Sequence, residues 1–207
     1  MHGAVCVAYG VTARREAVAS IKALSQRNIM PVVCICDEPL GVAGVTEVVG
    51  IPGKRGARWA KLHADKAAPR EWDAFVYLDA DTRVQCDIGA GFDILADGWD
   101  VALVASAHQG AELFWHIDAS EAGVTLYEIG NAWPLQLQCG VMFVRRNDAT
   151  AALFETWREE WSRWQDQDQA AFMRALYRSP VKLWLLGQPW NGGAVIGHRW
   201  GAIRGKA

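Results

Sequence analysis

The chain has 207 residues, of which 51% are hydrophobic and 21% are charged, and its formal net charge is -2. These values are typical of a single globular domain with a sizeable core, and the small net charge gives no indication of a nucleic-acid-binding protein. No apolar run approaches the ~20 residues that span a bilayer, and the N-terminus lacks the regions of a signal peptide. We therefore expect no membrane span.

The cysteines favour a cytoplasmic location. Most of the five lie in apolar, strand-like runs: the cysteines are Cys6, Cys34, Cys36, Cys86 and Cys139. Cys34 and Cys36 form a Cys-x-Cys pair with no second pair to complete a zinc site, so they are interpreted as core residues. An odd number of buried thiols favours the reducing cytoplasm.

Strand and helix patterns alternate in the first part of the chain. The predicted elements are strands at 4–9, 30–36 and 45–51 and a helix at 13–26. Thr12 is placed to cap that helix. A second helix, which carries Arg58, Lys61 and Lys66, leads to a fourth strand. This order predicts a Rossmann-like parallel half-sheet.

Two common nucleotide-binding motifs are absent from the sequence. After the first strand the chain reads Gly10-Val11-Thr12, without the glycines of a dinucleotide fingerprint, and there is no GxxxxGK[ST] phosphate loop. A NAD enzyme or a P-loop kinase is therefore not expected.

Residues 75–84 carry the strongest chemical signal. An apolar run with β-branched and aromatic residues predicts a buried strand, and it ends in Asp79 and Asp81. Two carboxylates ~4 Å apart repel by roughly 4 kcal/mol at an effective dielectric near 20, so a cation, a proton or a basic side chain must offset them. The alternative is that Asp79 caps the next turn and Asp81 is solvated.

The middle of the chain predicts a helix at 88–95 and strands at 100–105 and 137–144. Between them, residues 106–135 have no clear periodicity, and this long loop-rich segment is either an acceptor-binding region or a surface excursion. Its polar and aromatic residues are His108, Trp115, His116, Asp118 and Trp133, followed by Pro134.

The last third predicts two helices and a strand. A helix starts at Asn147 or Asp148, and its stripe of Leu153, Trp157, Trp161 and Trp164 is interpreted as core packing. Asp166 and Gln169 match a capping box for a second helix, whereas Asp168 has no such structural explanation. A strand follows at 181–186, and the glycine-rich tail is expected to be irregular.

Four segments in the same order resemble the nucleotide-sugar glycosyltransferases of the GT-A fold, and most closely the glycogenin-like group, glycosyltransferase family eight. They are the Asp-x-Asp strand at 77–82, the Gly-Val strand at 138–143, the Asp-Gln helix start at 168–172 and the late histidine, His198. The resemblance implies an α/β fold with a GT-A-type, Rossmann-like mixed sheet flanked by helices in a single domain. Its nucleotide-binding half would cover about 1–105 and its acceptor and sugar half about 106–207.

The resemblance also implies a metal-dependent transfer of a sugar from a UDP-sugar, with retention, to an unknown acceptor. Asp79, Asp81 and His198 would hold Mn²⁺ or Mg²⁺, and an oxygen and imidazole shell favours Mn²⁺. The metal would act as Lewis acid for the departing diphosphate, to which Arg58 or Lys61 would add positive charge.

Further roles follow from the same resemblance. Asp168 and Gln169 would bind sugar hydroxyls. The nucleotide would be bound by Ala8, Tyr9, Gly10, Val11, Thr12, Asp37, Ala80 and Gly140. The family's late histidine precedes a Gly-x-x-Lys-Pro-Trp-like tail, which Gly201 with Arg204 or Lys206 matches loosely.

Three other functions are consistent with parts of the pattern. A haloacid-dehalogenase-type phosphatase also has a strand followed by Asp-x-Asp, but it requires Thr or Val where this chain has Arg83. A nucleotidyltransferase would have a loop rich in glycine and arginine after the first strand, and here only Arg14 and Arg15 are present. The third alternative is a non-catalytic sugar-nucleotide binder.

Overall fold

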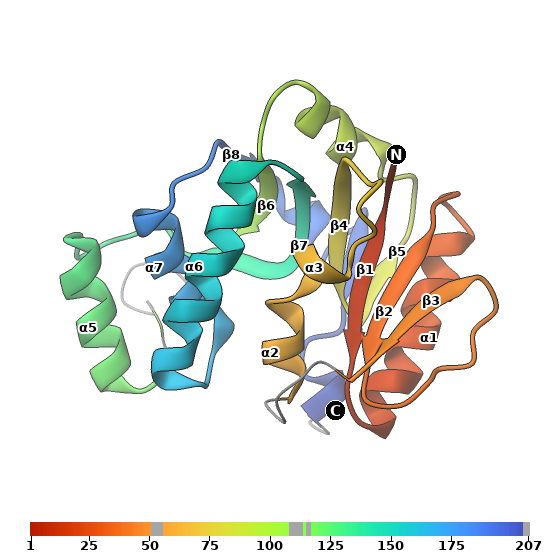
Figure 1. Cartoon of the computed structure of the whole chain (residues 1–207), viewed down its shortest axis with the longest axis horizontal. Helices are drawn as coiled ribbons and strands as arrows, with labels where there is room; N and C mark the ends of the chain where they lie inside the picture. Colours follow the sequence, from red (N-terminus) through yellow and green to blue (C-terminus); the bar gives the residue numbers. More distant parts are fainter. Residues whose placement is uncertain (51–55, 108–113, 115–116, 205–207) are drawn as a thin grey trace.

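A mixed sheet forms the centre of the molecule in the computed structural model, which describes residues 1–50, 56–107, 114 and 117–204. Within these residues the sheet has seven strands in the order β3-β2-β1-β4-β7-β6-β8 (Figure 1). Their bounds, in chain order, are β1 His2–Ala8, β2 Val32–Cys36, β3 Val45–Val49, β4 Ala74–Asp79, β6 Val101–Ala105, β7 Leu137–Arg145 and β8 Leu183–Leu186.

The sheet is divided between β4 and β7. Strands β3, β2, β1 and β4 are parallel, which confirms the predicted Rossmann-like half. Strand β7 is antiparallel to both β4 and β6, and β8 is parallel to β6. The change of direction places the carboxyl end of β4 beside the start of β7, which is where ligands bind in open α/β sheets.

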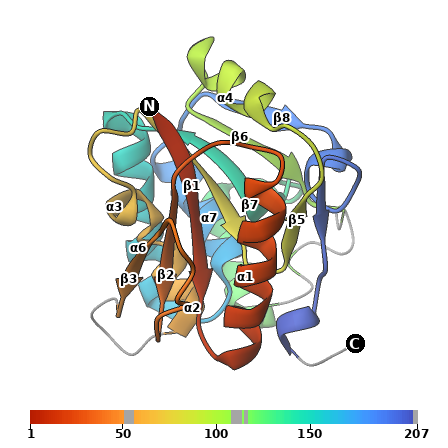
Figure 2. The same ribbon diagram turned by 90° about the vertical axis from the view of Figure 1, so that its right-hand side faces the viewer.

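Helices cover both faces of the sheet (Figures 1 and 2). Helices α1 (Val11–Ser25) and α4 (Gly89–Ala96) pack on one face. On the other face lie α2 (Gly56–Lys61), α3 (Ala64–Ala67) and α7 (Asp168–Arg178), together with α6 (Asp148–Trp164), which packs against α7. Side chains of a strand alternate between faces, so Val5 and Val7 belong to one core and Ala4 and Cys6 to the other.

The tryptophan stripe of α6 packs in the core and also holds the start of α7 by hydrogen bonds. Trp157 and Trp161 are buried, as predicted, and Trp164 is half-buried. The indole N–H of Trp157 donates to the carbonyl of Asp168 (2.9 Å), and that of Trp161 donates to the carbonyl of Asp166 (3.0 Å). These two bonds fix the chain where α7 begins.

The segment at 106–135 is more regular than predicted, because Ala119–Ile129 forms helix α5. The side chain of Asp118 caps it by accepting from the amide of Ser120, and Gly130 ends it with φ 66°. Helix α5 was not predicted because its helical pattern is short and its apolar face is interrupted by alanine, glycine and threonine. His108, Trp115 and His116 lie outside the described residues.

Two predicted helix caps were wrong. Thr12 lies inside α1, whose N-cap is Gly10 (φ 86°), a backbone geometry that favours glycine. Helix α7 begins after Gln167 and has no side-chain cap, so Asp166 and Gln169 do not form a capping box. The predicted helix that carries Arg58, Lys61 and Lys66 is two short helices, α2 and α3.

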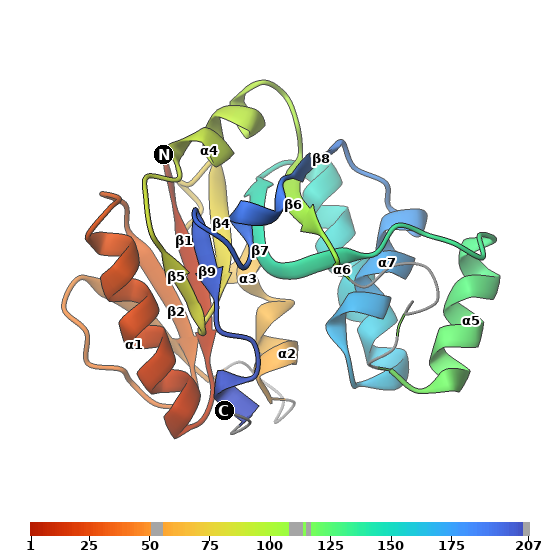
Figure 3. The ribbon, with the colours of Figure 1, turned by 180° about the vertical axis from the view of Figure 1, so that it is seen from behind.

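The glycine-rich tail contains a strand that was not predicted. Strand β9 (Ile196–His198) pairs antiparallel with β5 (Thr82–Val84), and together they form a two-stranded sheet on the α1 side of the molecule (Figure 3). Short 3-10 turns precede and follow β9, η2 at Gln188–Trp190 and η3 at Ala202–Arg204. Within the described part of the chain, no helix has the length and apolar character to cross a bilayer.

Candidate metal centre

Three predicted ligands converge where β4 ends. Asp79 is the last residue of β4, a turn follows at Ala80 and Asp81, and β5 then pairs with β9 in a register that sets Thr82 opposite His198. The hydroxyl of Thr82 closes the turn by donating to the carbonyl of Asp79 (2.8 Å). The β5–β9 ladder therefore brings the late histidine to the two acids.

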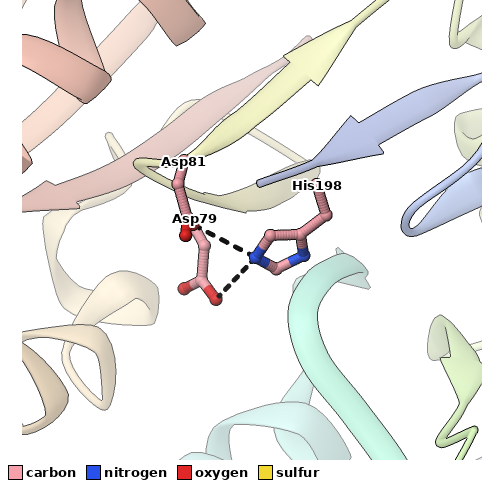
Figure 4. Close-up of side chains that lie close together, drawn as sticks. All are labelled: Asp79, Asp81 and His198. Carbon is pink, nitrogen blue, oxygen red and sulfur yellow. Dashed lines mark hydrogen bonds and ion pairs between the residues drawn. The ribbon is translucent and has the colours of Figure 1, made fainter. Parts of the chain in front are cut away.

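The geometry fits a divalent cation (Figure 4). His198 Nε2 lies 3.1 Å from Asp81 Oδ1 and 3.9 Å from Asp79 Oδ2. One ligand atom from each of the three residues lies within 4.8 Å of the others. Two carboxylate oxygens and one imidazole nitrogen suit Mn²⁺ well, while Mg²⁺ prefers oxygen and water.

Gly140, on β7, leaves the space that this centre needs. A Cβ atom at this position would lie 2.6 Å from His198 Cε1 and 2.8 Å from Asp79 Oδ2. Any side chain here would displace two of the three candidate ligands. The requirement explains a glycine inside an otherwise buried strand.

We expect Gly140→Ala to weaken Mn²⁺ binding by at least about tenfold, since displaced ligands lose coordination geometry. The matched control is Gly123→Ala on α5, where an added Cβ meets nothing within 4 Å and helix propensity favours alanine. Calorimetric titration with Mn²⁺ compares the two variants. Equal affinities would show that β7 does not border the cation site.

The second oxygen of Asp79 is held by the protein. The hydroxyl of Tyr77 donates to Asp79 Oδ1 (2.8 Å), and the ammonium of Lys61 lies 3.5 Å from the same atom. Burial and the neighbouring Asp79 raise the pKa of Tyr77, which keeps the phenol a donor. Asp79 therefore has Oδ2 facing His198, while Oδ1 is held by Tyr77 and Lys61.

Lys61 joins two predicted site residues in one buried ion cluster. Its ammonium lies 2.7 Å from Asp168 Oδ2, and the Lys61 side chain is 8% exposed. Burial alone would lower the pKa of Lys61, but Asp168 and Asp79 outweigh it and the pKa is raised. Burial would raise the pKa of Asp168, and the charge of Lys61 reverses that effect so that the pKa is lowered.

The predicted diphosphate and sugar contacts have partners within the protein. Gln169 Nε2 donates to the carbonyl of Leu137 (2.9 Å), so this amide also ties α7 to β7. Arg58 pairs with Asp166 (3.1 Å) at the surface. The positive charge of Lys61 neutralises the carboxylates of Asp79 and Asp168. The roles of these residues toward a substrate remain predictions.

The predicted nucleotide residues gather at the ends of β1 and β2. The amide of Gly10 donates to Asp37 Oδ2 (2.8 Å). Arg14 donates to Asp37 Oδ1 (2.6 Å), and these bonds outweigh burial to lower the pKa of Asp37. Ala8 is buried, Tyr9 is half-buried and Thr12 is exposed. Ala8 neighbours the end of β4, where Ala80 is buried, because Val7 pairs with Asp79.

Several residues around the centre were not predicted. Glu16 on α1 binds both Arg83 and Arg199, the latter at 3.0 Å, and the amide of Arg199 donates to the carbonyl of Asp81 (3.0 Å). These contacts hold the tail against the turn that carries the acids. Asn191, which contacts His198, was also missed. No sequence signal singles out Asn191, because its contact with His198 depends on the tail pairing back onto β5.

No protein-family model and no curated protein matches the sequence. Solved structures do match. WbbM, a bifunctional glycosyltransferase, superposes with a TM-score of 0.66 at 18% identity, covering 91% of this chain and 39% of WbbM. The glycosyltransferase GlyE of Streptococcus pneumoniae TIGR4 gives 0.61 at 12% identity, covering 91% of this chain and 45% of GlyE. The chain thus spans less than half the length of these two enzymes.

The galactosyltransferase LgtC, solved with donor and acceptor sugar analogues, matches with a TM-score of 0.56 at 16% identity, covering 91% of this chain and 74% of LgtC. At these identities the likeness establishes the fold. The chain has the GT-A glycosyltransferase fold, which confirms the fold that the family resemblance implied. Among the matched structures are members of glycosyltransferase family eight, including LgtC.

Proposed function

We propose that the chain is a metal-dependent glycosyltransferase that moves a sugar from a UDP-sugar to an acceptor, with retention of configuration. The observation that carries this proposal is the convergence of Asp79, Asp81 and His198 at the end of β4 in a GT-A fold. Retention and the uridine base rest on the family resemblance. The free cysteines support a cytoplasmic location.

The three ligands would hold Mn²⁺, or Mg²⁺, against the diphosphate. When bound, the cation supplies Lewis acidity that stabilises the negative charge developing on the departing nucleoside diphosphate. The protein supplies a fixed coordination shell, since Asp79 is held by Tyr77 and Lys61, and His198 is held by the β5–β9 ladder. Such preorganised charge needs no rearrangement during the reaction.

The remaining predicted residues divide between the two ends of the donor. Gly10, Thr12 and Asp37, with Ala8 and Tyr9, would bind the nucleoside at the ends of β1 and β2. Small residues at Ala80 and Gly140 leave room beside the cation. Asp168 and Gln169 would bind sugar hydroxyls, and losing one such bond leaves a buried partner unpaired at a cost of about 1–3 kcal/mol.

Thermal-shift measurements with a panel of nucleotides and nucleotide sugars test the proposal. At a ligand concentration 100-fold above Kd, we expect UDP with Mn²⁺ to raise Tm by about 5–10 °C. UDP with EDTA should give a much smaller rise, because the cation held by Asp79, Asp81 and His198 would supply most of the attraction for the diphosphate. Absence of a shift with every nucleotide in the presence of either cation would contradict the proposal.

Turnover separates the transferase from its alternatives. We expect the protein to release UDP from whichever UDP-sugar raises Tm in the panel, by slow hydrolysis or by transfer of the sugar to an added acceptor. Binding without any release would indicate a non-catalytic sugar-nucleotide binder, and phosphate release from a generic phosphoester would indicate a phosphatase.

A further inference from the structure

The side-chain amide of Asn191 is buried and has one hydrogen-bond partner among the described residues. Asn191 follows η2 in the tail and is 1% exposed. Its Oδ1 lies 2.6 Å from His198 Nδ1, whereas its Nδ2 is buried without a hydrogen-bond partner among the described residues. Burying a donor without a partner costs about 1–3 kcal/mol. The bond to His198 is thus the contact that accounts for an amide at this position.

The two nitrogens of His198 face different oxygens. Nδ1 faces Asn191, and Nε2 faces Asp81 Oδ1 at 3.1 Å and Asp79 Oδ2 at 3.9 Å. A neutral imidazole has one N–H, so it can donate from only one of these nitrogens. If Nδ1–H donates to Asn191, then Nε2 presents its lone pair to two carboxylates. That arrangement is favourable when a cation lies between them.

The surroundings hold both side chains in place. The ring of Trp200 stacks on His198, with centroids 5.1 Å apart and an interplanar angle of 29°. The same indole packs on Gly192, where a Cβ would lie 2.2 Å from a ring carbon. The amide of Gly192 donates to the carbonyl of Ile196 (2.8 Å). The loop that carries Asn191 is therefore tied to β9, the strand that carries His198.

We propose that Asn191 is a positioning residue that selects the Nδ1–H tautomer of His198 and so directs the Nε2 lone pair at the cation. The inference rests on the proposed function, because it needs the divalent cation at Asp79 and Asp81. Asn191 is not one of the three candidate ligands. It acts through the hydrogen bond from His198.

Two variants and one spectrum test this role. Asn191→Leu keeps the size of the side chain but removes the acceptor, so Mn²⁺ affinity should fall about 10–100-fold. Asn191→Asp keeps an acceptor and should retain at least wild-type affinity. Asn131→Leu, in the exposed turn after α5, is the matched control and should bind Mn²⁺ normally. Affinities are measured by electron paramagnetic resonance of free Mn²⁺.

The spectrum reports the tautomer directly, with the diamagnetic ion Cd²⁺ as probe. In wild-type protein with Cd²⁺, the ¹⁵N shifts of the His198 ring, assigned with His198→Gln, should show a protonated Nδ1 and a metal-bound Nε2. In Asn191→Leu, the chemical shift of Nδ1–H should move away from the value typical of a hydrogen-bonded N–H. Wild-type Mn²⁺ affinity in Asn191→Leu, or an Nε2–H tautomer in the Cd²⁺ form, would overturn the inference.

Failure of the wider proposal gives a different result. If wild-type protein binds neither Mn²⁺ nor Cd²⁺, the metal centre and the inference both fall. If wild-type protein binds Mn²⁺ and all three Asn variants bind it equally, the metal centre stands and only the role of Asn191 is overturned.

Discussion

Asp81→Asn is expected to abolish Mn²⁺-dependent binding of UDP. Asp81 is 6% exposed, and its Oδ1 is the oxygen nearest to His198 Nε2. An amide oxygen is a neutral and much weaker ligand than a carboxylate, and two of the three candidate ligands would then be neutral. With a fixed UDP and Mn²⁺ concentration, the rise in Tm seen for wild-type protein should disappear.

The same change should leave the fold intact. Replacing Asp81 removes one of two neighbouring negative charges, and this relief of repulsion offsets the weaker bond to His198. We expect Tm of the ligand-free variant to stay within about 2 °C of wild type. Asp93→Asn, on the exposed side of α4, is the control and should keep the full ligand-dependent shift. An Asp81→Asn protein that still binds UDP with Mn²⁺ would exclude Asp81 from the site.

The second large effect is expected from Lys61→Met, which should lower the free energy of unfolding at pH 7 by about 3–5 kcal/mol. The ammonium of Lys61 lies 2.7 Å from Asp168 and 3.5 Å from Asp79. Without it, the buried carboxylate of Asp168 loses its ion-pair partner and keeps only the weaker influence of Arg58. Urea unfolding monitored by tryptophan fluorescence measures the loss.

In this variant, the contribution of Asp168 to stability should change with pH in the opposite direction. In wild-type protein the pKa of Asp168 is lowered by folding, so its contribution to stability is present at neutral pH and is lost as pH falls through that pKa. In Lys61→Met, burial should instead raise the pKa of Asp168. As pH falls from neutral, Asp168 should therefore add to the stability of the variant. In wild-type protein the same residue contributes less stability as pH falls.

Two further variants separate charge from packing. Lys66→Met removes an exposed ion-pairing lysine on α3, 3.8 Å from Glu155, and should cost less than about 1 kcal/mol. Adding Asp168→Asn to Lys61→Met should restore part of the lost stability, because the second change removes the unpaired charge. If the double variant is no more stable than Lys61→Met, then lost packing rather than charge explains the defect.

Local sequence patterns predicted most of the sheet and both acids of the candidate metal centre. Apolar runs define β1, β2 and β4 because buried parallel strands are apolar on both faces. The position of Asp79 at the end of such a run was enough to indicate a site. Local patterns failed at α5, where the helical signal is weak, and at the N-termini of α1 and α7, where packing decides the boundary.

Long-range pairing could not be read from local patterns. His198 was assigned to the centre by family resemblance alone, because a three-residue strand in a glycine-rich tail gives no periodicity. The ion pair between Lys61 and Asp168 depends on how α2 and α7 meet over the sheet. Asn191 was missed because its role depends on that same tail folding back onto β5.

The β5–β9 ladder also affects the order of folding. Asp81 and His198 are 117 residues apart in the chain, and they meet through the last strand. Contacts of such high sequence separation close late, because the entropy of the intervening loop must be lost first. The three candidate ligands should therefore come together only after the main sheet has formed, so a growing chain would not offer a complete site for a metal ion before its core is complete.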